Sequence, residues 1–215
     1  MSSRIALLGG MFDPVHNGHI EAARYALREL KVDRLKMIPC HSPNHKDSPH
    51  SNSRHRLAML EAAIKSESGI EVDPLEINRS GVSYTVDTLL ELKRLDASAS
   101  LVFVLGIDAF NSLPQWHRWL ALPQLCHFLV LARSGAEISQ NSADQLGITQ
   151  RLVSSTDEMF ESESGKVLYA KDFSYDLSST AIRQQLMSNQ DARVDLNEDV
   201  LAYIKENQLY GLGNR

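Results

Sequence analysis

The segment Gly9–His19, which reads GGMFDPVHNGH, constrains the fold more than any other stretch of the chain. It follows the apolar run Ile5–Leu8, which predicts a strand, and it ends with His16 and His19 around a glycine where a helical pattern begins. Glycine lets a backbone approach a ligand closely, and the unpaired N–H groups at a helix N-terminus bind phosphate. Each histidine can add a further donor and, when protonated, a charge. The segment therefore predicts a cradle for a phosphate group.

Other kinds of site fit this segment less well. The dinucleotide pattern GxGxxG and the P-loop pattern GxxxxGK[ST] are absent from it. A zinc pair of the HExxH type needs a different histidine spacing on a helix and a third ligand. Two loop histidines are most often plain polar residues, but His16 and His19 lie close to a double glycine that follows an apolar strand. This combination favours the phosphate cradle.

Composition limits the class of protein. With 215 residues, 43% apolar and 23% charged, the chain is expected to form one globular domain with a sizeable core. Its net charge of −5 argues against a nucleic-acid partner, which would require a basic face. No apolar run approaches the ~20 residues that span a membrane, and the first residues show no signal-peptide pattern. Cys40 and Cys126 are far apart and typical of reduced thiols, which predicts a cytoplasmic protein.

Apolar runs alternate with helical patterns along the chain. Runs that are apolar on both faces, such as LVFVL and FLVLA, suit parallel strands covered by helices. The alternation predicts an α/β fold, a doubly wound Rossmann-like parallel sheet flanked by helices, with ligands beyond the carboxyl ends of the strands. The expected strands are Ile5–Leu8, Leu35–Pro39, Ile70–Val72 with Leu75–Ile77, Leu101–Leu105, Phe128–Leu131 and, more weakly, Val167–Tyr169.

Three helical patterns lie between these strands. The first joins Ile20 to Leu30, the second Leu57 to Ile64, and the third Val86 to Lys93, with a hydroxyl cap near Thr85. Residues 134–166 are polar and poorly periodic, so we expect them to form a variable excursion.

A second cluster of polar residues, SSTAIR, begins at Ser178. Its hydroxyl residues precede the helical pattern of Ile182 and Leu186 and predict an N-cap, with amides left for an anion. Arg183 is expected in the first turn of this helix, where a cation opposes the helix dipole. That position indicates an anionic partner, although a plain surface arginine is the commoner case.

Together, the two clusters resemble the signature of the nucleotidyltransferase superfamily, in which H-x-G-H and I-S-S-T-x-I-R elements bind the phosphates of ATP. Leu177 replaces the first isoleucine, and the polar residues of the element are intact. The resemblance implies a single nucleotidyltransferase domain over residues 1–215, with a C-terminal helical part at about 178–210. The ATP contacts that it implies are Gly9, Gly10, Met11, Phe12, His16, His19, Gly106, Asp108, Arg133, Ser179, Thr180 and Arg183.

Further motifs narrow the resemblance to the bacterial nicotinate mononucleotide adenylyltransferases. Glu76 and the run Arg79–Leu89 are similar to E-x-x-R-x-G-x-S-Y-T-x-D-T-L, and PNHK at 43–46 is similar to P-P-H-K/R with an asparagine in place of the second proline. The GID and WH sequences at 106–108 and 116–117 resemble the G-x-D and W-x positions. The contacts with nicotinate mononucleotide that this implies are Lys46, Ser83, Tyr84, Thr85, Trp116 and His117. A plain helix cap would explain Thr85 alone, and a core tryptophan would explain Trp116.

The reaction that the resemblance implies converts ATP and nicotinate mononucleotide into nicotinate adenine dinucleotide and pyrophosphate, with Mg²⁺ carried on the phosphates. The attacking phosphate oxygen is already anionic near neutral pH because its second pKa is about 6. No general base is therefore required. The implied catalytic residues are His16, His19, Lys46 and Arg183, which would neutralise the leaving pyrophosphate. The metal is expected to be held mostly by the substrate; Asp13 and Asp108 stay open as contacts, although Asp13 is rather expected to fix the turn before the helix.

Two other functions stay open on the sequence alone. A phosphopantetheine or other nucleotide adenylyltransferase would share HNGH and SSTAIR but has no reason to carry SYTVDT. A regulator that holds ATP without turnover would not need so many cations around the phosphates. The sequence also leaves the oligomeric state open, a homo-oligomer included.

A group of four histidines lies beside Cys40, at positions 41, 45, 50 and 55. The spacing is compatible with zinc, but metal sites need ligands fixed by surrounding groups. Because the stretch is rich in serine, proline and asparagine, we expect a solvated loop.

Overall fold

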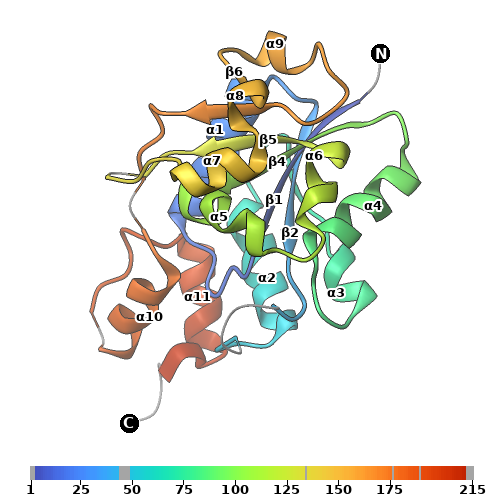
Figure 1. Cartoon of the computed structure of the whole chain (residues 1–215). Helices are drawn as coiled ribbons and strands as arrows, with labels where there is room; N and C mark the ends of the chain where they lie inside the picture. Colours follow the sequence, from blue (N-terminus) through green and yellow to red (C-terminus); the bar gives the residue numbers. More distant parts are fainter. Residues whose placement is uncertain (1–2, 44–48, 134, 176, 189, 212–215) are drawn as a thin grey trace.

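A parallel sheet lies at the centre of the computed structural model, which describes residues 3–43, 49–133, 135–175, 177–188 and 190–211 (Figure 1). Within these residues the sheet has seven strands in the order β3-β2-β1-β4-β5-β7-β6, and every neighbouring pair is parallel. The strands are β1 (Arg4–Gly10), β2 (Arg34–Pro39), β3 (Ile70–Val72), β4 (Ser100–Gly106), β5 (His127–Leu131), β6 (Leu152–Val153) and β7 (Val167–Ala170). The doubly wound α/β prediction is confirmed.

Helices connect the strands and cover both faces of the sheet. The longer ones are α1 (Asn17–Leu30), α2 (Ser53–Ile64), α4 (Thr85–Leu95), α7 (Gln140–Leu146), α10 (Ser179–Met187) and α11 (Glu198–Glu206). The short ones are α3 (Leu75–Arg79), α5 (Ile107–Ser112), α6 (Leu122–Leu125), α8 (Ile148–Arg151), α9 (Thr156–Met159), η1 (Leu113–Gln115), η2 (Trp119–Ala121) and η3 (Leu209–Gly211). No helix of the described ranges is long and apolar enough to cross a membrane.

Strand β1 shows how the sequence pattern builds two cores. Successive side chains of a strand point to opposite faces, so Ala6 and Leu8 join one apolar cluster with α1, α2, α10 and α11. Ile5 and Leu7 join a second cluster with α4, α5 and α6. A strand buried on both faces needs the continuous apolar run that predicted it.

The order of the sheet reverses at β1. The chain runs outward from β1 to β2 and β3 and then returns to place β4 on the other side of β1. In such sheets the crevice for a ligand opens beyond the carboxyl ends of the two strands at the reversal. Gly9 and Gly10 end β1, and Gly106 ends β4, so both glycine turns lie at this crevice.

Two expected elements differ in the structure. Residues Leu75–Ile77 are not a strand but lie in α3, because Pro74 precedes them at the helix N-cap and Asp73 Oδ1 accepts a bond of 3.1 Å from the amide of Leu75. Helix α4 is capped by Tyr84 and makes no side-chain cap bond, so the expected hydroxyl cap near Thr85 is wrong. Thr85 is instead the first helical residue.

The stretch 134–166 has more structure than its composition predicts. Among its described residues it carries α7, α8, β6 and α9, and β6 extends the sheet by pairing with β7. Strand β6 is only Leu152–Val153. A run this short has no periodicity that could have revealed it.

His127 is a titratable group inside the sheet. Its side chain has no exposed area, and burial lowers its pKa to about 4. The pKa of a histidine in the unfolded chain is about 6.5. As the pH falls from about 6.5 to 4, His127 is therefore protonated in the unfolded chain but stays neutral in the folded protein. Stability is therefore lost as the pH falls through this window.

We expect His127→Asn to flatten the acid side of the stability curve. Urea unfolding at several pH values between 7 and 4.5 should show a slope that is smaller by up to about 1.4 kcal/mol per pH unit, the contribution of one proton. His50→Asn, at a side chain that is 54% exposed, controls for the loss of an imidazole as such. Equal flattening in both variants would contradict the role of burial.

Candidate active site

Two imidazole rings stand together where α1 begins. His16 is the N-cap of α1, and its backbone N–H donates to Nδ1 of His19 over 3.3 Å. The two ring centroids are 3.8 Å apart, and the ring of Phe12 meets His19 edge-on at 5.0 Å. The predicted histidine pair is thus a preformed unit at a helix start. One amide of that start, that of Asn17, already donates to the carbonyl of Asp195 at 2.9 Å.

Two glycines of the predicted cradle, Gly10 and Gly18, pack closely against neighbouring rings. A Cβ on Gly18 would lie 3.0 Å from His16 Nδ1 and 3.0 Å from the ring of Tyr175, and a Cβ on Gly10 would lie 3.0 Å from the ring of Phe12. These distances are too short for a side chain without displacement of its neighbours. Gly106 differs, because a Cβ there would meet nothing within 4 Å.

A cavity of about 290 Å³ opens beside this histidine pair. It brings together predicted residues from β4, the end of β5, α1 and α10, namely His16, His19, Gly106, Arg133 and Ser179. Phe173, Tyr175 and Leu177 also line it. Phe173 and Tyr175 were missed by the sequence analysis, because they follow β7 in a stretch without a motif.

His16 is the buried member of the histidine pair. His16 is 6% exposed, and burial lowers its pKa to about 4, partly offset by the charge of Asp195. In the protein without ligand His16 is therefore a neutral donor at pH 7. The charge that a protonated ring would add is therefore absent from His16 in this state.

Helix α10 begins as predicted but carries its arginine elsewhere. Ser178 is the N-cap and accepts a bond of 3.2 Å from the amide of Ala181. Arg183 is the fifth residue of α10 and lies in the second turn, so the expected first-turn position is wrong. Its guanidinium donates to the carbonyl of Asp13 at 2.7 Å and to Oγ1 of Thr180 at 3.1 Å. The α10 arginine is thus tied to the turn that precedes α1.

Asp13 fixes that turn through its carboxylate. Asp13 is 2% exposed, and its carboxylate accepts from the amide of His50 at 2.7 Å, from Ser51 Oγ at 2.6 Å and from the hydroxyl of Tyr210 at 2.6 Å. The hydroxyl of Ser179 donates to the carbonyl of Pro14 at 3.0 Å. These bonds give Asp13 a structural role in the turn that leads into α1.

Part of the histidine-rich stretch is held by the same bonds. His50 and Ser51 bind Asp13, and His55 lies in α2 with its Nδ1 3.0 Å from the hydroxyl of Tyr203. Nδ1 of His41 is 3.1 Å from the carbonyl of Gly81. The solvated-loop expectation is therefore wrong for His41 and His55, whose rings meet long-range partners. His50 is held through its amide while its side chain is 54% exposed, and His45 lies outside the described residues. Across the described residues no three histidine, cysteine or acidic side chains gather around a metal position.

A second set of predicted residues gathers around the start of α4. The backbone N–H of Ser83 donates to the carbonyl of Ser42 at 2.8 Å, and Oγ of Ser83 accepts from the amide of His41 at 2.9 Å. The ring of Tyr84 stacks on that of His117 with centroids 4.3 Å apart. The loops that follow β2 and α3 are thereby joined, and aromatic rings stand at the first amide of α4.

Trp116 packs against the core. It is partly buried, its Nε1–H donates to Oγ of Ser112 at 3.1 Å, and its ring meets Phe103 edge-on at 6.2 Å. These two contacts of the indole ring stabilise the fold.

Glu76 and Arg79, which precede the SYTVDT sequence, form hydrogen bonds that stabilise the fold. Glu76 is buried and accepts from Oγ1 of Thr88 at 2.6 Å, while Arg79 donates to the same oxygen at 3.1 Å and pairs with Glu91 at 3.2 Å. These bonds join α3 to α4. They hold the helix start that presents Thr85.

The remaining predicted residues lie at the edges of the cavity or outside the described residues. Arg133 is exposed and pairs with Asp108, also exposed, at 3.2 Å. The ring of Phe12 is buried, and the carbonyl of Met11 accepts from Arg56. Lys46 lies outside the described residues.

Arg56 was missed by the sequence analysis. It has no exposed area and donates to the carbonyls of Met11 at 2.8 Å and His41 at 3.0 Å, which joins the loops after β1 and β2. Its position one turn before the buried Met59 and Leu60 places a charge on the apolar face of α2. A charge in an apolar helical pattern is a signal that could have found it.

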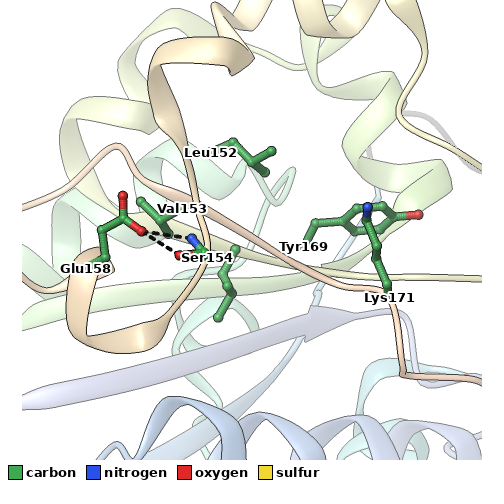
Figure 2. Close-up of a pocket in the computed structure, with 7 residues that line it drawn as sticks. Leu152, Val153, Ser154, Glu158, Tyr169 and Lys171 are labelled. Atoms are coloured by element: carbon green, nitrogen blue, oxygen red, sulfur yellow. Dashed lines mark hydrogen bonds between the residues drawn. The ribbon is translucent and has the colours of Figure 1, made fainter.

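A larger hollow of about 400 Å³ lies elsewhere, at the β6 edge of the sheet. Figure 2 shows Glu158 and Ser154 bonded to each other on one side, and Tyr169 and Lys171 on the other. None of the motifs from the sequence falls on it. The chemistry-bearing residues gather in the smaller cavity.

Comparisons with known proteins identify the family of the chain. The model of the cytidylyltransferase-like family matches residues 7–185. A protein of Hahella chejuensis named "Probable nicotinate-nucleotide adenylyltransferase" is 37% identical over 99% of this chain and 98% of its own length. A Pseudomonas fluorescens protein of the same name is 39% identical over the whole of both chains.

Solved structures show the same fold. The Plasmodium falciparum nicotinic acid mononucleotide adenylyltransferase complexed with NaAD superposes with a TM-score of 0.77 at 19% identity, covering 99% of this chain and all of the other. The same enzyme complexed with APC gives a TM-score of 0.74 at 18% identity, with the same coverage. From its matched model and its full-length relatives, the chain belongs to the cytidylyltransferase-like family and, within it, to the nicotinate-nucleotide adenylyltransferases.

Proposed function

We propose that this protein transfers the adenylyl group of ATP to nicotinate mononucleotide, forming nicotinate adenine dinucleotide and pyrophosphate. The observation that carries the proposal is the convergence of His16, His19 and the N-terminal end of α10 on one cavity at the reversal of the sheet. The relatives' names give the acceptor. Two solved structures of one such enzyme contain NaAD and APC, as their descriptions state.

The phosphates of ATP are assigned to this cavity. His16 and His19 would donate to the phosphate oxygens together with Ser179, which lines the same cavity. Thr180 and Arg183 follow Ser179 in α10 and are bonded to each other, although neither lines the cavity. Gly9, Gly10 and Gly106 lie at the strand ends, where the chain gives a nucleotide close access. Arg133 and Asp108 border the side of β5, and Met11 and Phe12 support the cradle from beneath. Lys46 keeps its predicted role as a phosphate cation.

Catalysis in this proposal is a matter of position and charge. The acceptor phosphate is already anionic at pH 7, so the protein needs only to align the two nucleotides and offset the charge on the leaving pyrophosphate. Burial keeps His16 neutral before ATP binds. An anion beside the ring raises its pKa from this low value, while the neutral imidazole already serves as a hydrogen-bond donor.

Mg²⁺ is proposed as a companion of ATP. Asp13 has its carboxylate turned to three internal donors, which leaves the exposed Asp108 as a carboxylate at the edge of the cavity. Mg²⁺ often keeps waters and binds substrate phosphates with one or two carboxylates. The donor set fits a metal ion held mainly by the nucleotide, which would screen the phosphate charge.

The acceptor is assigned to the start of α4. Ser83, Tyr84 and Thr85 lie in one loop and helix start, and His117 stacks on Tyr84. The amides at this helix end can receive a carboxylate, and the aromatic rings, Trp116 included, can face a pyridine ring.

The thiols Cys40 and Cys126 fit the cytoplasmic location that we propose for this reaction.

Release of pyrophosphate tests the function directly. The purified protein should release pyrophosphate only when ATP, Mg²⁺ and a mononucleotide acceptor are all present, and the dinucleotide should accumulate in equal amount. Phosphopantetheine and other phosphate acceptors in the same panel test the other adenylyltransferase activities. ATP binding without pyrophosphate release in any mixture would favour the regulator.

Arg183→Ala should impair the use of ATP more than the binding of the mononucleotide. Arg183 lies one turn after Ser179, which lines the cavity, and its guanidinium is held by Asp13 and Thr180. Its loss removes a charge-assisted donor worth roughly tenfold or more in kcat/KM for ATP. Arg193→Ala, at a side chain that is 74% exposed and paired with Asp191, is the matched control. An effect confined to the KM of the mononucleotide would place Arg183 in the other subsite.

A further inference from the structure

The C-terminal end of the described chain reaches the turn that precedes α1. The hydroxyl of Tyr210 donates to Oδ1 of Asp13 at 2.6 Å and lies 3.1 Å from Oγ of Ser51, although 197 residues separate Tyr210 from Asp13. Ser51 donates to the same carboxylate oxygen. The carboxylate is thus shared by the N-terminal turn, the segment before α2 and the C-terminal segment.

The backbone bends sharply to bring Tyr210 to this place. Gln208 has φ of 51° and Tyr210 has φ of 55°, both in the left-handed region that side chains other than glycine adopt at a cost. Such residues persist where the surrounding structure holds them and often lie near functional sites. Burial, together with the hydrogen bond to Asp13, raises the pKa of Tyr210 well above its usual value. The phenol therefore stays protonated and keeps its role as donor.

The residue that Tyr210 holds is also the anchor of α10. The carbonyl of Asp13 accepts from Arg183, and the next carbonyl, that of Pro14, accepts from Ser179. The carboxylate of Asp13 is thus fixed from the C-terminal side while its main chain is fixed from α10. Loss of the first anchor would free the turn that leads into His16.

We propose that Tyr210 is a positioning residue for the phosphate site, which fixes through Asp13 the relative placement of His16 and Arg183. The inference rests on the proposed use of ATP at this cavity. Tyr210 is not among the residues that line the cavity, so it acts through Asp13. Nothing in the sequence motifs identifies it.

Tyr210→Phe tests the proposal, because it removes one hydroxyl and keeps the ring. We expect kcat/KM for ATP to fall by about tenfold, the scale of one hydrogen bond to a charged group, while the KM for nicotinate mononucleotide changes less than about twofold. The matched control is Tyr203→Phe, which removes another hydroxyl from the C-terminal segment, one that meets His55 rather than Asp13. The control should leave both constants within about twofold.

Combination with Asp13→Asn shows whether Tyr210 acts through Asp13. In that background the further effect of Tyr210→Phe should shrink, because the acceptor has lost its charge. Should Tyr210→Phe fail to fold, Ser51→Ala removes a different donor from the same oxygen and should shift kcat/KM for ATP in the same direction. Equal losses for both substrates, equal losses in Tyr203→Phe, or full additivity with Asp13→Asn would each overturn the proposal.

Equilibrium binding of ATP separates this proposal from the proposed reaction. Calorimetry needs no acceptor, so Tyr210→Phe should weaken ATP binding whether or not the dinucleotide is formed. Absence of product with wild-type protein would count against the reaction alone. Unchanged ATP affinity in Tyr210→Phe, with unchanged kinetics, would remove the role of Tyr210.

Discussion

Replacement of His19 by alanine is expected to lower kcat by about 10²-fold or more, the scale of the loss of one preorganised donor to developing charge. His19 lines the cavity, and its ring is fixed from three sides by the ring of His16, the backbone of His16 and the edge of Phe12. A donor held in this way needs no reorganisation as charge builds on the leaving pyrophosphate. Single-turnover rates with saturating ATP and acceptor measure the effect.

Two variants distinguish chemistry from packing at His19. His19→Gln keeps a neutral donor on a longer, more mobile side chain and should recover part of the lost rate. Phe12→Leu removes the ring edge that meets His19 and should cause a smaller loss, because the imidazole remains. Turnover close to that of the wild type in folded His19→Ala would end the assignment of His19 to the phosphates.

The elements of this fold that could be predicted from the sequence are those with long apolar runs, whereas segments of two or three residues could not be assigned. Strands β1, β4 and β5 are continuous apolar runs, so their existence and their central position could be predicted from the sequence. Leu75–Ile77 alternates over three residues, which fits a strand as well as one helical turn, and the preceding proline decided for the helix. Strand β6 is shorter still and is defined only by its pairing with β7.

In the site, residues that belong to a local sequence motif could be predicted, whereas residues that act through a distant partner could not. Glycines, histidines and the Ser178 cap are local features, and the structure places His16, His19 and Ser179 on one cavity. Arg183 was placed one turn too early, although a count from the correctly predicted cap puts it in the second turn. Tyr210 gave no local signal, since its partner Asp13 lies at the other end of the chain.

We expect kcat/KM for nicotinate mononucleotide to exceed that for nicotinamide mononucleotide by at least ~10²-fold. Thr85 begins α4, and its N-cap Tyr84 makes no side-chain cap bond, so the first amides of α4 are suited to an anion. Hydrogen bonds to a charged group contribute roughly 1.5–3 kcal/mol each, against about 1 for neutral ones. A nicotinamide would also turn its own N–H₂ toward one of these donors.

Backbone donors can be removed singly at this helix start. Thr85→Pro deletes the first amide of α4 at the helical position that tolerates proline best, and Tyr84 already has the extended conformation that a following proline requires, with φ of −111° and ψ of 127°. We expect the preference for nicotinate mononucleotide to fall about tenfold, mainly through this acceptor. Gln140→Pro makes the same change at the start of α7 and should leave the preference unchanged. Equal efficiency of the wild-type protein with both acceptors would show that this helix start does not bind the carboxylate, and would indicate dual specificity.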